Sequence, residues 1–480
     1  MRRPSVLALI LFAACAGGCR DERAPATGST LEATLVDRDG DAALEPGPGE
    51  RLIERTELAP RSPARRELGR FAQLSDAHVR DEESPARLPF LDRLGAPFTA
   101  AFRPQEALSA AVLDAAVRSL DALRPQAVVV TGDLIDSAQR NELEQALAVL
   151  RGGWVDPDSG ARGYSGVQAA GNADPSYYRP DVDSPRHPGL LDRGQRRFRA
   201  AGLRAPWYPV VGNHEVLVQG VVAPTRRLRS VAVGSRVLAR PDEDLPATGR
   251  EPSPALVDRL LVAGLPGETV RTPADSGRRQ LSPRALIGRL RPGERGPLLD
   301  YSFALAPGLR GIVLDLARRD SGESGLLRPS QRRILERELR RVDAAGALAV
   351  VFSHQPIASS EGGQAALHVL DRHTSVIAAV SGHTHRNSVV PRRTQRGGYW
   401  LIGTASLADH PQQTRAFRLV ETASAGRALE TWMIDHAGGP LAGPARELAF
   451  IDAQGGRPAG NAGGDGDRNA RLFVPRRARR

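Results

Sequence analysis

Residues 127–136 read AVVVTGDLID, an apolar run that leads directly into Gly132, Asp133 and Asp136. A short apolar run that ends at a glycine and a carboxylate is typical of a buried β-strand followed by a polar loop. An apolar run followed directly by a polar motif recurs at four more places, which are FAQLS before Asp76-Ala77-His78, WYPVV before Gly212-Asn213-His214-Glu215, ALAVVF before Ser353-His354, and SVIAAV before Ser381-Gly382-His383-Thr384-His385. The sequence therefore predicts several strands whose ends deliver Asp, Asn and His side chains to one place.

These residue types fit a site for two metal ions. Two divalent ions lie about 3.5–4 Å apart only if an anionic ligand bridges them and further oxygen or nitrogen ligands complete each shell. Both cysteines, Cys15 and Cys19, lie far from the motifs, which excludes a thiolate site. Mixed imidazole and carboxylate ligation suits Mn, Fe, Zn, Co or Ni better than Ca or Mg. We expect Mn, Fe or Zn, and the motifs do not choose among them.

The order and spelling of the motifs resemble the calcineurin-like metallophosphoesterase superfamily over roughly residues 71–436. The resemblance implies that Asp76, His78 and His385 hold the first ion. It also implies that Asn213, His354 and His383 hold the second ion, and that Asp133 bridges the two. The fold that it implies is an α/β, four-layer α-β-β-α sandwich with the metal site at the carboxyl ends of the strands.

The resemblance also implies a reaction, which is hydrolysis of phosphomonoesters or phosphodiesters by a hydroxide bound to the dinuclear metal centre. His214 follows Asn213 and is not a ligand in the superfamily, so its imidazole is free to donate a proton to the leaving group. Asp136 is expected to orient His214. The expected substrate is a small phosphoester, and the sequence decides neither its identity nor the choice between monoester and diester.

The motifs of this chain differ from those of three neighbouring subfamilies, and these differences narrow the choice of subfamily. Purple acid phosphatases carry a tyrosine at the position of Asp136, and serine/threonine phosphatases continue with Arg-Gly where Ser137 and Ala138 stand. Periplasmic 5′-nucleotidases add a whole substrate domain, which the few dozen residues after His436 cannot build. What is left looks like the cyclic-nucleotide phosphodiesterase-like branch, in a larger bacterial subgroup that carries residues 81–87 as a signature.

The amino terminus predicts export. Arg2 and Arg3 precede an apolar run over residues 6–16 that is too short to span a bilayer. Ala16-Gly17-Gly18-Cys19 resembles a lipobox, so we expect lipidation at Cys19 and a lipoprotein that faces the periplasm or the cell exterior. Secretion without lipid is the alternative. The segment 1–19 would then be a signal peptide, and residues 20–66, with little apolar periodicity, a flexible tether.

The remaining segments predict one catalytic domain over residues 67–450, with insertions at about 151–190 and 217–298. We expect helices over residues 104–123 and from Pro329, and closing strands at RAFRLVE and ALETWMI. The first insertion, with its tryptophan and tyrosines, is a candidate substrate cap or else a surface excursion. Residues 451–480 are Gly- and Arg-rich and are expected to be mostly disordered, apart from a short strand over residues 471–474.

The distribution of charge argues against nucleic-acid binding, and the sequence context of the remaining histidines argues against a role for them in the site. The net charge of +11 comes from arginines that are scattered among acidic residues, with few aromatic residues to stack on bases, so we expect no nucleic-acid partner. The other histidines lie outside the motifs and are expected to be superficial or structural; they are His187, His368, His373, His410 and His436. Of these, His410 is the one whose segment we expect could return to the site. The main alternative to an enzyme is a catalytically weak, surface-anchored protein that binds a phosphorylated ligand. The oligomeric state stays open.

Overall fold

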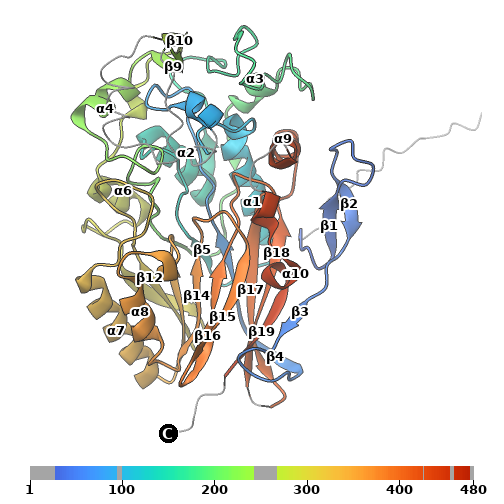
Figure 1. Cartoon of the computed structure of the whole chain (residues 1–480), viewed down its shortest axis with the longest axis vertical. Helices are drawn as coiled ribbons and strands as arrows, with labels where there is room; N and C mark the ends of the chain where they lie inside the picture. The colour runs from blue at the N-terminus through green and yellow to red at the C-terminus, as the bar shows by residue number, and fades with distance from the viewer. Residues whose placement is uncertain (1–27, 95–99, 243–266, 425, 455–458, 476–480) are drawn as a thin grey trace, which may run out of the picture.

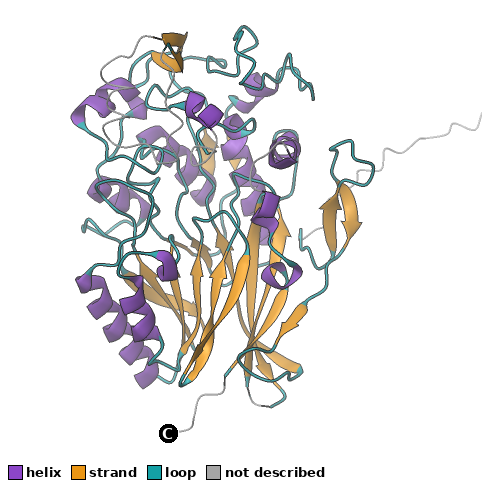
Figure 2. Cartoon of the chain, in the orientation of Figure 1, coloured by secondary structure: helices purple, strands orange, loops and turns teal. Residues whose placement is uncertain are grey.

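Two β-sheets form the centre of the computed structural model, which describes residues 28–94, 100–242, 267–424, 426–454 and 459–475 (Figures 1 and 2). The larger sheet has the strand order β3 (Ile53–Arg55), β19 (Ala470–Val474), β18 (Arg427–Asp435), β17 (Gln413–Thr422), β4 (Ala64–Leu74), β5 (Val128–Val130) and β8 (Trp207–Pro209). The smaller has the order β11 (Tyr301–Ala306), β12 (Leu309–Leu314), β13 (Leu348–Ser353), β14 (Val376–Ser381), β16 (Gly397–Gly403) and β15 (Ser388–Thr394). In each sheet a parallel set of strands adjoins antiparallel strands.

The two sheets pack on each other through a layer of apolar side chains. Phe71 of β4 stacks on Phe417 of β17 with ring centroids 4.6 Å apart, and Phe71 meets Phe352 of β13 edge to face at 6.1 Å. All three rings are fully buried. Because offset and edge-to-face contacts add to the free energy gained by burial, this aromatic cluster fixes how the sheets face each other.

Helices cover the outer face of each sheet (Figure 1). Helices α1 (Ser109–Ala122) and α2 (Arg140–Arg151) share one apolar cluster with side chains of β4 and β5. On the smaller sheet, α7 (Pro329–Ala344) and α8 (Gly363–Leu370) pack on β12 and β13, at the lower left of the view. The predicted α/β fold, a four-layer α-β-β-α sandwich, is confirmed.

Local sequence signals explain the helix ends. Helix α7 begins at Pro329, as predicted, because proline lacks the N–H that a first helical turn leaves unpaired. The helix predicted over residues 104–123 is shorter, since a 3₁₀ turn, η2 (Glu106–Leu108), precedes α1. The two predicted closing strands are β17 and β18, which pair antiparallel with each other.

The predicted tether over residues 20–66 differs from the structure wherever that segment is described. Strands β1 (Ala33–Val36) and β2 (Glu45–Pro48) form a hairpin, and β3 pairs in parallel with β19. The main chain of Thr30 also donates to the carbonyl of Met433 at 3.0 Å. These contacts are made mostly by backbone groups, so they leave no apolar periodicity in the sequence. The signal peptide with Cys19, and residues 20–27, lie outside the described residues.

The predicted disorder of residues 451–480 also differs from the structure. Helix α9 (Ala442–Gln454) packs on α1, and η6 (Ala459–Ala462) and α10 (Asp465–Arg468) lead into β19. The strand predicted at 471–474 is β19, and it lies between β3 and β18 inside the larger sheet. The many glycines and arginines of this segment favoured a prediction of disorder, because only a few of its residues, such as Leu472 and Phe473, are apolar and buried. The sandwich thus extends past both ends of the predicted domain.

Both insertions contain small elements at the end of the molecule that is uppermost in Figure 1. Strand β6 (Gly153–Val155) pairs with β7 (Phe198–Ala200), and α3 (Leu190–Gly194) lies between them in sequence. The second insertion holds α4 (Arg226–Ala232), β9 (Arg236–Pro241), β10 (Gly267–Arg271), η4 (Ser276–Arg278) and α6 (Pro283–Leu290). Two further 3₁₀ turns are η1 (Pro89–Leu94) and η5 (Ile357–Ser359). Across the described ranges, every helix is too short or too polar to cross a bilayer.

Candidate metal centre

The five motifs meet at the carboxyl ends of strands from both sheets. Asp76 and His78 follow β4, Asp133 follows β5, and Asn213 and His214 follow β8 in the larger sheet. From the smaller sheet, His354 follows β13, and His383 and His385 follow β14. Parallel strands place their carboxyl ends at one edge, so the packing of the two sheets brings these loops together. The convergence expected from the sequence is therefore present.

Two groups of side chains in this cluster could each hold a metal ion. One consists of Asp76, His78 and His385, and the other consists of Asp133, His354 and His383; within each group the candidate ligand atoms lie within 4.8 Å of one another. His78 Nε2 and His385 Nε2 are 3.2 Å apart, and His354 Nε2 is 2.9 Å from Asp133 Oδ2. A third group, His78 with Asp133 and His214, overlaps both. Asp133 thus belongs to two of the three groups.

The electrostatics of the cluster fit cations. Asp76 and Asp133 are at most 2% exposed, and in the described chain they form no ion pair with a guanidinium. A buried carboxylate is costly unless a positive charge compensates it. Among the described residues, the positive partners of Asp76 and Asp133 are imidazoles. Burial lowers the pKa of His354, but Asp133 and Asp76 outweigh burial and raise it to about 9. Metal ions would supply the missing charge, and the donor set of carboxylate, imidazole and amide groups suits them.

Asn213 has its amide fixed by two contacts. Its Nδ2 donates to the carbonyl of Gly220 at 3.0 Å, and its Oδ1 accepts from Gln355 Nε2 at 3.1 Å. Gly220 has a φ of +71°, and a Cβ at this position would lie 2.3–2.4 Å from atoms of Asn213 and His214. Only glycine therefore fits here. The contacts turn the carbonyl oxygen of Asn213, the atom that can bind a metal, away from Gly220.

Glu215, the last residue of its motif, is a positioning residue that the sequence interpretation did not use. Its Oε2 accepts from the main-chain N–H groups of Asp133 at 2.8 Å and Gly212 at 2.7 Å. Its Oε1 accepts from Leu134 at 2.7 Å and Ile135 at 3.2 Å. One buried carboxylate thus joins the loop after β5 to the loop after β8. A signal was available in the sequence, because Glu215 is an acidic residue directly after the two predicted site residues Asn213 and His214.

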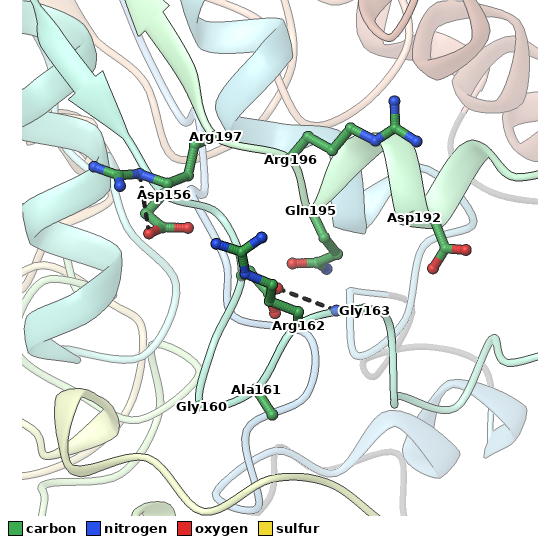
Figure 3. Close-up of a pocket in the computed structure, with 10 residues that line it drawn as sticks. Asp156, Gly160, Ala161, Arg162, Gly163, Asp192, Gln195, Arg196 and Arg197 are labelled. Carbon is green, nitrogen blue, oxygen red and sulfur yellow. Dashed lines mark hydrogen bonds and ion pairs between the residues drawn. The ribbon is translucent and has the colours of Figure 1, made fainter.

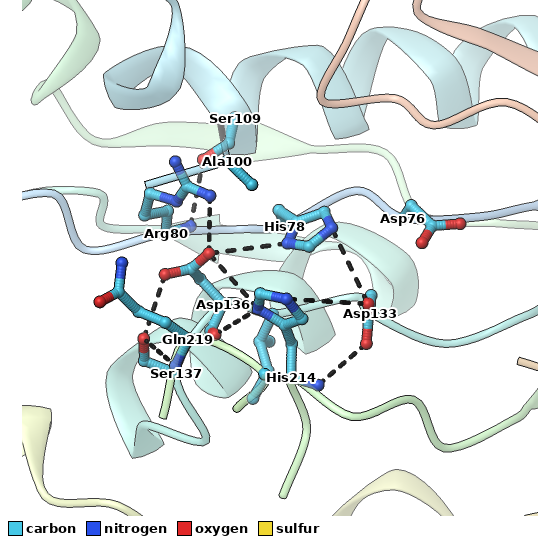
Figure 4. Close-up of polar contacts among 12 residues, drawn as sticks. Asp76, His78, Arg80, Ala100, Ser109, Asp133, Asp136, Ser137, His214 and Gln219 are labelled. Atoms are coloured by element: carbon cyan, nitrogen blue, oxygen red, sulfur yellow. Dashed lines mark hydrogen bonds and ion pairs between the residues drawn. The ribbon is translucent and has the colours of Figure 1, made fainter. Parts of the chain in front are cut away.

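His214 lies beside the cluster, and its contact with Asp136 is not the expected one. Nδ1 of His214 is 2.6 Å from the main-chain oxygen of Asp136 but 3.6 Å from its carboxylate (Figure 4). The carboxylate instead accepts from Arg80 Nη2 at 2.6 Å. Burial raises the pKa of Asp136, but the charge of Arg80 together with contacts from His214, His78 and Arg87 holds this pKa well below its usual range. Nδ1 therefore carries the proton of the neutral ring, and Nε2 is left toward Asp133, 4.0 Å away.

Asp409 is a further residue that the motifs did not include. Its carboxylate contacts Nδ1 of His385 and, on its other side, is held by Arg103 through two hydrogen bonds. Burial raises the pKa of Asp409, but the charges of Arg103 and His385 lower it well below its usual range. An ionised carboxylate at Nδ1 directs Nε2 of His385 into the cluster. The segment around His410 does return to the site, but the residue of this segment that contacts a candidate ligand is Asp409.

The other histidines outside the motifs have different surroundings. His373 Nδ1 lies 2.6 Å from Asp343, and His436 is buried beside Gln412. His187 contacts Glu447 at 3.2 Å, and His368 is exposed on α8. His410 lies against Phe450 with the two rings tilted and their centroids 5.1 Å apart, and it forms part of the wall of the cavity described next.

A cavity of about 490 Å³ opens over the histidine cluster. Its outer wall comes from residues near the carboxyl terminus, Ala449, Asp452, Gly460 and Asn461, and from Arg386 and Glu323. A volume of this size accommodates a small organic ligand. The wall contains no residue of the first insertion, so among the described residues the proposed substrate cap over 151–190 does not cover this cavity.

The first insertion lines a different cavity, of about 760 Å³. Figure 3 shows Arg162, Asp192, Gln195 and Arg197 around it. None of its lining residues is shared with the cavity over the histidines. No group of metal-ligating side chains lies there within the ranges described.

Replacing Asp409 with Asn should weaken metal binding at the group that contains His385. The neutral amide would no longer fix the ring with Nε2 toward the cluster, so we expect roughly 10- to 100-fold lower affinity for one of two Mn²⁺ ions, measured by titration calorimetry. Asp343→Asn is the matched control, because it alters the same His–Asp contact at His373, outside the cluster. Equal affinities for the wild-type protein and Asp409→Asn would rule out the positioning role.

Replacing Glu215 with Gln should destabilise the fold. The new NH₂ group would face two of the four N–H donors and leave them unpaired in a buried place, at roughly 1–3 kcal/mol each. We expect a clearly lower midpoint of thermal unfolding, recorded by circular dichroism. Glu144→Gln on the exposed face of α2 should change the midpoint little. A shift no larger than that of Glu144→Gln would contradict the role given to Glu215.

Comparisons with known proteins give a limited result. No family model matches the chain, and no curated protein matches it. Among solved structures, the chain is similar to a dimetal phosphatase from Danio rerio with a TM-score of 0.42 and 15% sequence identity, over 77% of this chain and 97% of that chain. Similarity at this level assigns neither a family nor an activity to the chain.

Proposed function

We propose that the chain is a metal-dependent phosphoesterase. The observation that carries the proposal is the pair of buried carboxylates, Asp76 and Asp133, which are surrounded by imidazoles and lack any guanidinium partner in the described residues. Together with Asn213, these groups provide seven candidate ligands for two divalent ions, which agrees with the set implied by the superfamily resemblance. Mn, Fe and Zn all suit these ligands.

The chain's own residues account for the remaining requirements of phosphoester hydrolysis. Two divalent ions held by the cluster would neutralise charge on the phosphoryl oxygens and lower the pKa of the attacking water. The protonated ring of His214 can give its Nε2 proton to the leaving-group oxygen, and this form is favoured because Asp133 and Asp136 outweigh burial, which lowers its pKa, and raise it. Glu215 and Gln355 hold Asp133 and Asn213 in place. The proposed substrates are small phosphoesters, and monoesters and diesters both remain candidates.

Two further parts of the proposal rest on the sequence. One is that the chain resembles the cyclic-nucleotide phosphodiesterase-like branch, and the other is that the protein is exported. Residues 1–27 lie outside the described residues, so the lipidation of Cys19 is supported by the lipobox-like Ala16-Gly17-Gly18 alone. Acyl chains contribute about 0.8 kcal/mol per buried CH₂ to membrane binding. The expected result is that the protein fractionates with membranes and that Cys19→Ala releases it. A wild-type protein with an uncleaved Met1 segment in the cytoplasm would exclude this part of the proposal.

Turnover of a phosphoester panel tests the function. The protein loaded with Mn²⁺, Fe²⁺ or Zn²⁺ should hydrolyse nitrophenyl phosphate or bis(nitrophenyl) phosphate, and chelation should abolish the activity. Asp133→Asn should lose both the activity and most of the bound metal, because Asp133 belongs to two of the candidate metal groups. Metal content is measured by mass spectrometry. If this variant keeps two ions per chain and near-normal turnover, the ligand assignment is wrong.

His214→Ala tests the general acid. Loss of the proton donor should slow alkyl phosphates by roughly 10²–10⁴-fold and nitrophenyl esters much less, because a good leaving group departs without a proton. The metal content should stay intact. Because His214 also lies in a possible metal group with His78 and Asp133, a loss of metal in this variant would make it a ligand instead. Equal losses for both kinds of ester would remove the acid role.

A further inference from the structure

Arg386 is the residue after the candidate ligand His385, and it lines the cavity over the metal cluster. Its side chain is exposed, and in the described part of the chain its guanidinium forms no hydrogen bond and no ion pair. A guanidinium carries five N–H donors in a planar fork that matches carboxylate and phosphate oxygens. Arg386 therefore brings unused anion-binding capacity to this cavity.

The other charged groups in the outer part of the cavity are already engaged. Arg103 binds both carboxylate oxygens of Asp409 and the carbonyl of Ala100. Glu323 and Asp452 are the remaining carboxylates of the wall, and each has interactions of its own. Among the described lining residues, Arg386 is thus the guanidinium available to a ligand.

The backbone around Arg386 is held in place. The next residue, Asn387, is fully buried; its main-chain N–H donates to the carbonyl of Asn461 at 2.8 Å, and its Nδ2 donates to the carbonyl of Ala462 at 3.1 Å. A Cβ on Gly460 would lie 4.0 Å from Cζ of Arg386, so the guanidinium is next to the turn at Gly460 and Asn461. The backbone of Arg386 is therefore fixed beside His385, while its guanidinium is exposed.

We propose that Arg386 binds a second anionic group of the substrate, so that the preferred substrates are phosphoesters whose organic part carries a carboxylate or another phosphate. The inference rests on the proposed function. Asp76 and Asp133 offset only part of the charge of two divalent ions, and the rest is available to the scissile phosphoryl group. An anion elsewhere on the substrate needs a different cation, and Arg386 provides it at the cavity wall.

A matched pair of substrates tests the inference. 4-Carboxyphenyl phosphate and 4-carbamoylphenyl phosphate have the same shape, and only the first carries a second anion. The wild-type protein should show a KM roughly two- to fivefold lower for the carboxylate, as expected for one exposed ion pair. Calorimetric titration of the corresponding phosphonates, whose P–C bond is not hydrolysed, should give the same preference in Kd.

The variants separate local recognition from net charge. Arg386→Gln should bring the ratio of the two KM values close to 1, and Arg386→Lys should restore part of the preference, because the charge returns without the planar fork. Arg333→Gln removes an exposed guanidinium on α7 and makes the same change in net charge away from the cavity. It should leave the ratio as in the wild-type protein.

Three results would overturn the inference: no preference in the wild-type protein, a preference that survives in Arg386→Gln, or an equal loss in Arg333→Gln. Failure of the proposed function is recognised separately. If neither ester is hydrolysed but the phosphonate preference is present and is lost in Arg386→Gln, the anion subsite stands and the phosphoesterase activity does not.

Discussion

The carboxylate of Glu215 is the group on which the geometry of the candidate metal centre depends. The loop after β5 turns at Gly132 and Asp133, with φ values of +89° and +46°, and this turn directs successive N–H groups to the same side. Such a concave row of N–H groups binds an anion. Glu215 supplies the acceptor oxygens for this row from the neighbouring loop, so the positions of Asp133 and Asn213 are set together. A buried side chain that is not itself a candidate ligand thereby fixes two candidate ligands relative to each other.

Backbone strain shows how strongly the surroundings determine this site. Five of the seven candidate ligands have positive φ values: Asp76 at 53°, His78 at 43°, Asp133 at 46°, His383 at 67° and His385 at 53°. For a residue other than glycine this conformation costs about 1–2 kcal/mol. The cost is offset by contacts such as those of Glu215 and, for His385, of Asp409. Strain of this kind concentrates where function requires a side chain to point in an unfavourable direction.

The sequence predicted the parts of this molecule that depend on local patterns. The strands before the motifs, the start of α7 at Pro329 and the meeting of the motifs all follow from apolar runs and the polar residues at their ends. Asp409 could not be predicted from local patterns. It lies 24 residues after its partner His385, and the two residues meet only once the intervening strands β15 and β16 have formed. The same holds for β3, which pairs with β19 across more than 400 residues of sequence. The apolar residues of β19 predicted a strand there, but neither segment carries a local pattern that reveals their pairing or their place in the larger sheet.

Residues 81–87, which the sequence singled out, form the link between the metal centre and the second insertion. Arg278 of the insertion is fully buried and donates to Asp81 at 2.8 Å and Glu83 at 3.3 Å. Arg87 holds both oxygens of Glu106, which also accepts from Arg80, the partner of Asp136. Burying ion pairs adds little net stability, because desolvation offsets the attraction, but a missing partner is very costly. The network therefore favours one arrangement of the second insertion relative to the candidate metal centre.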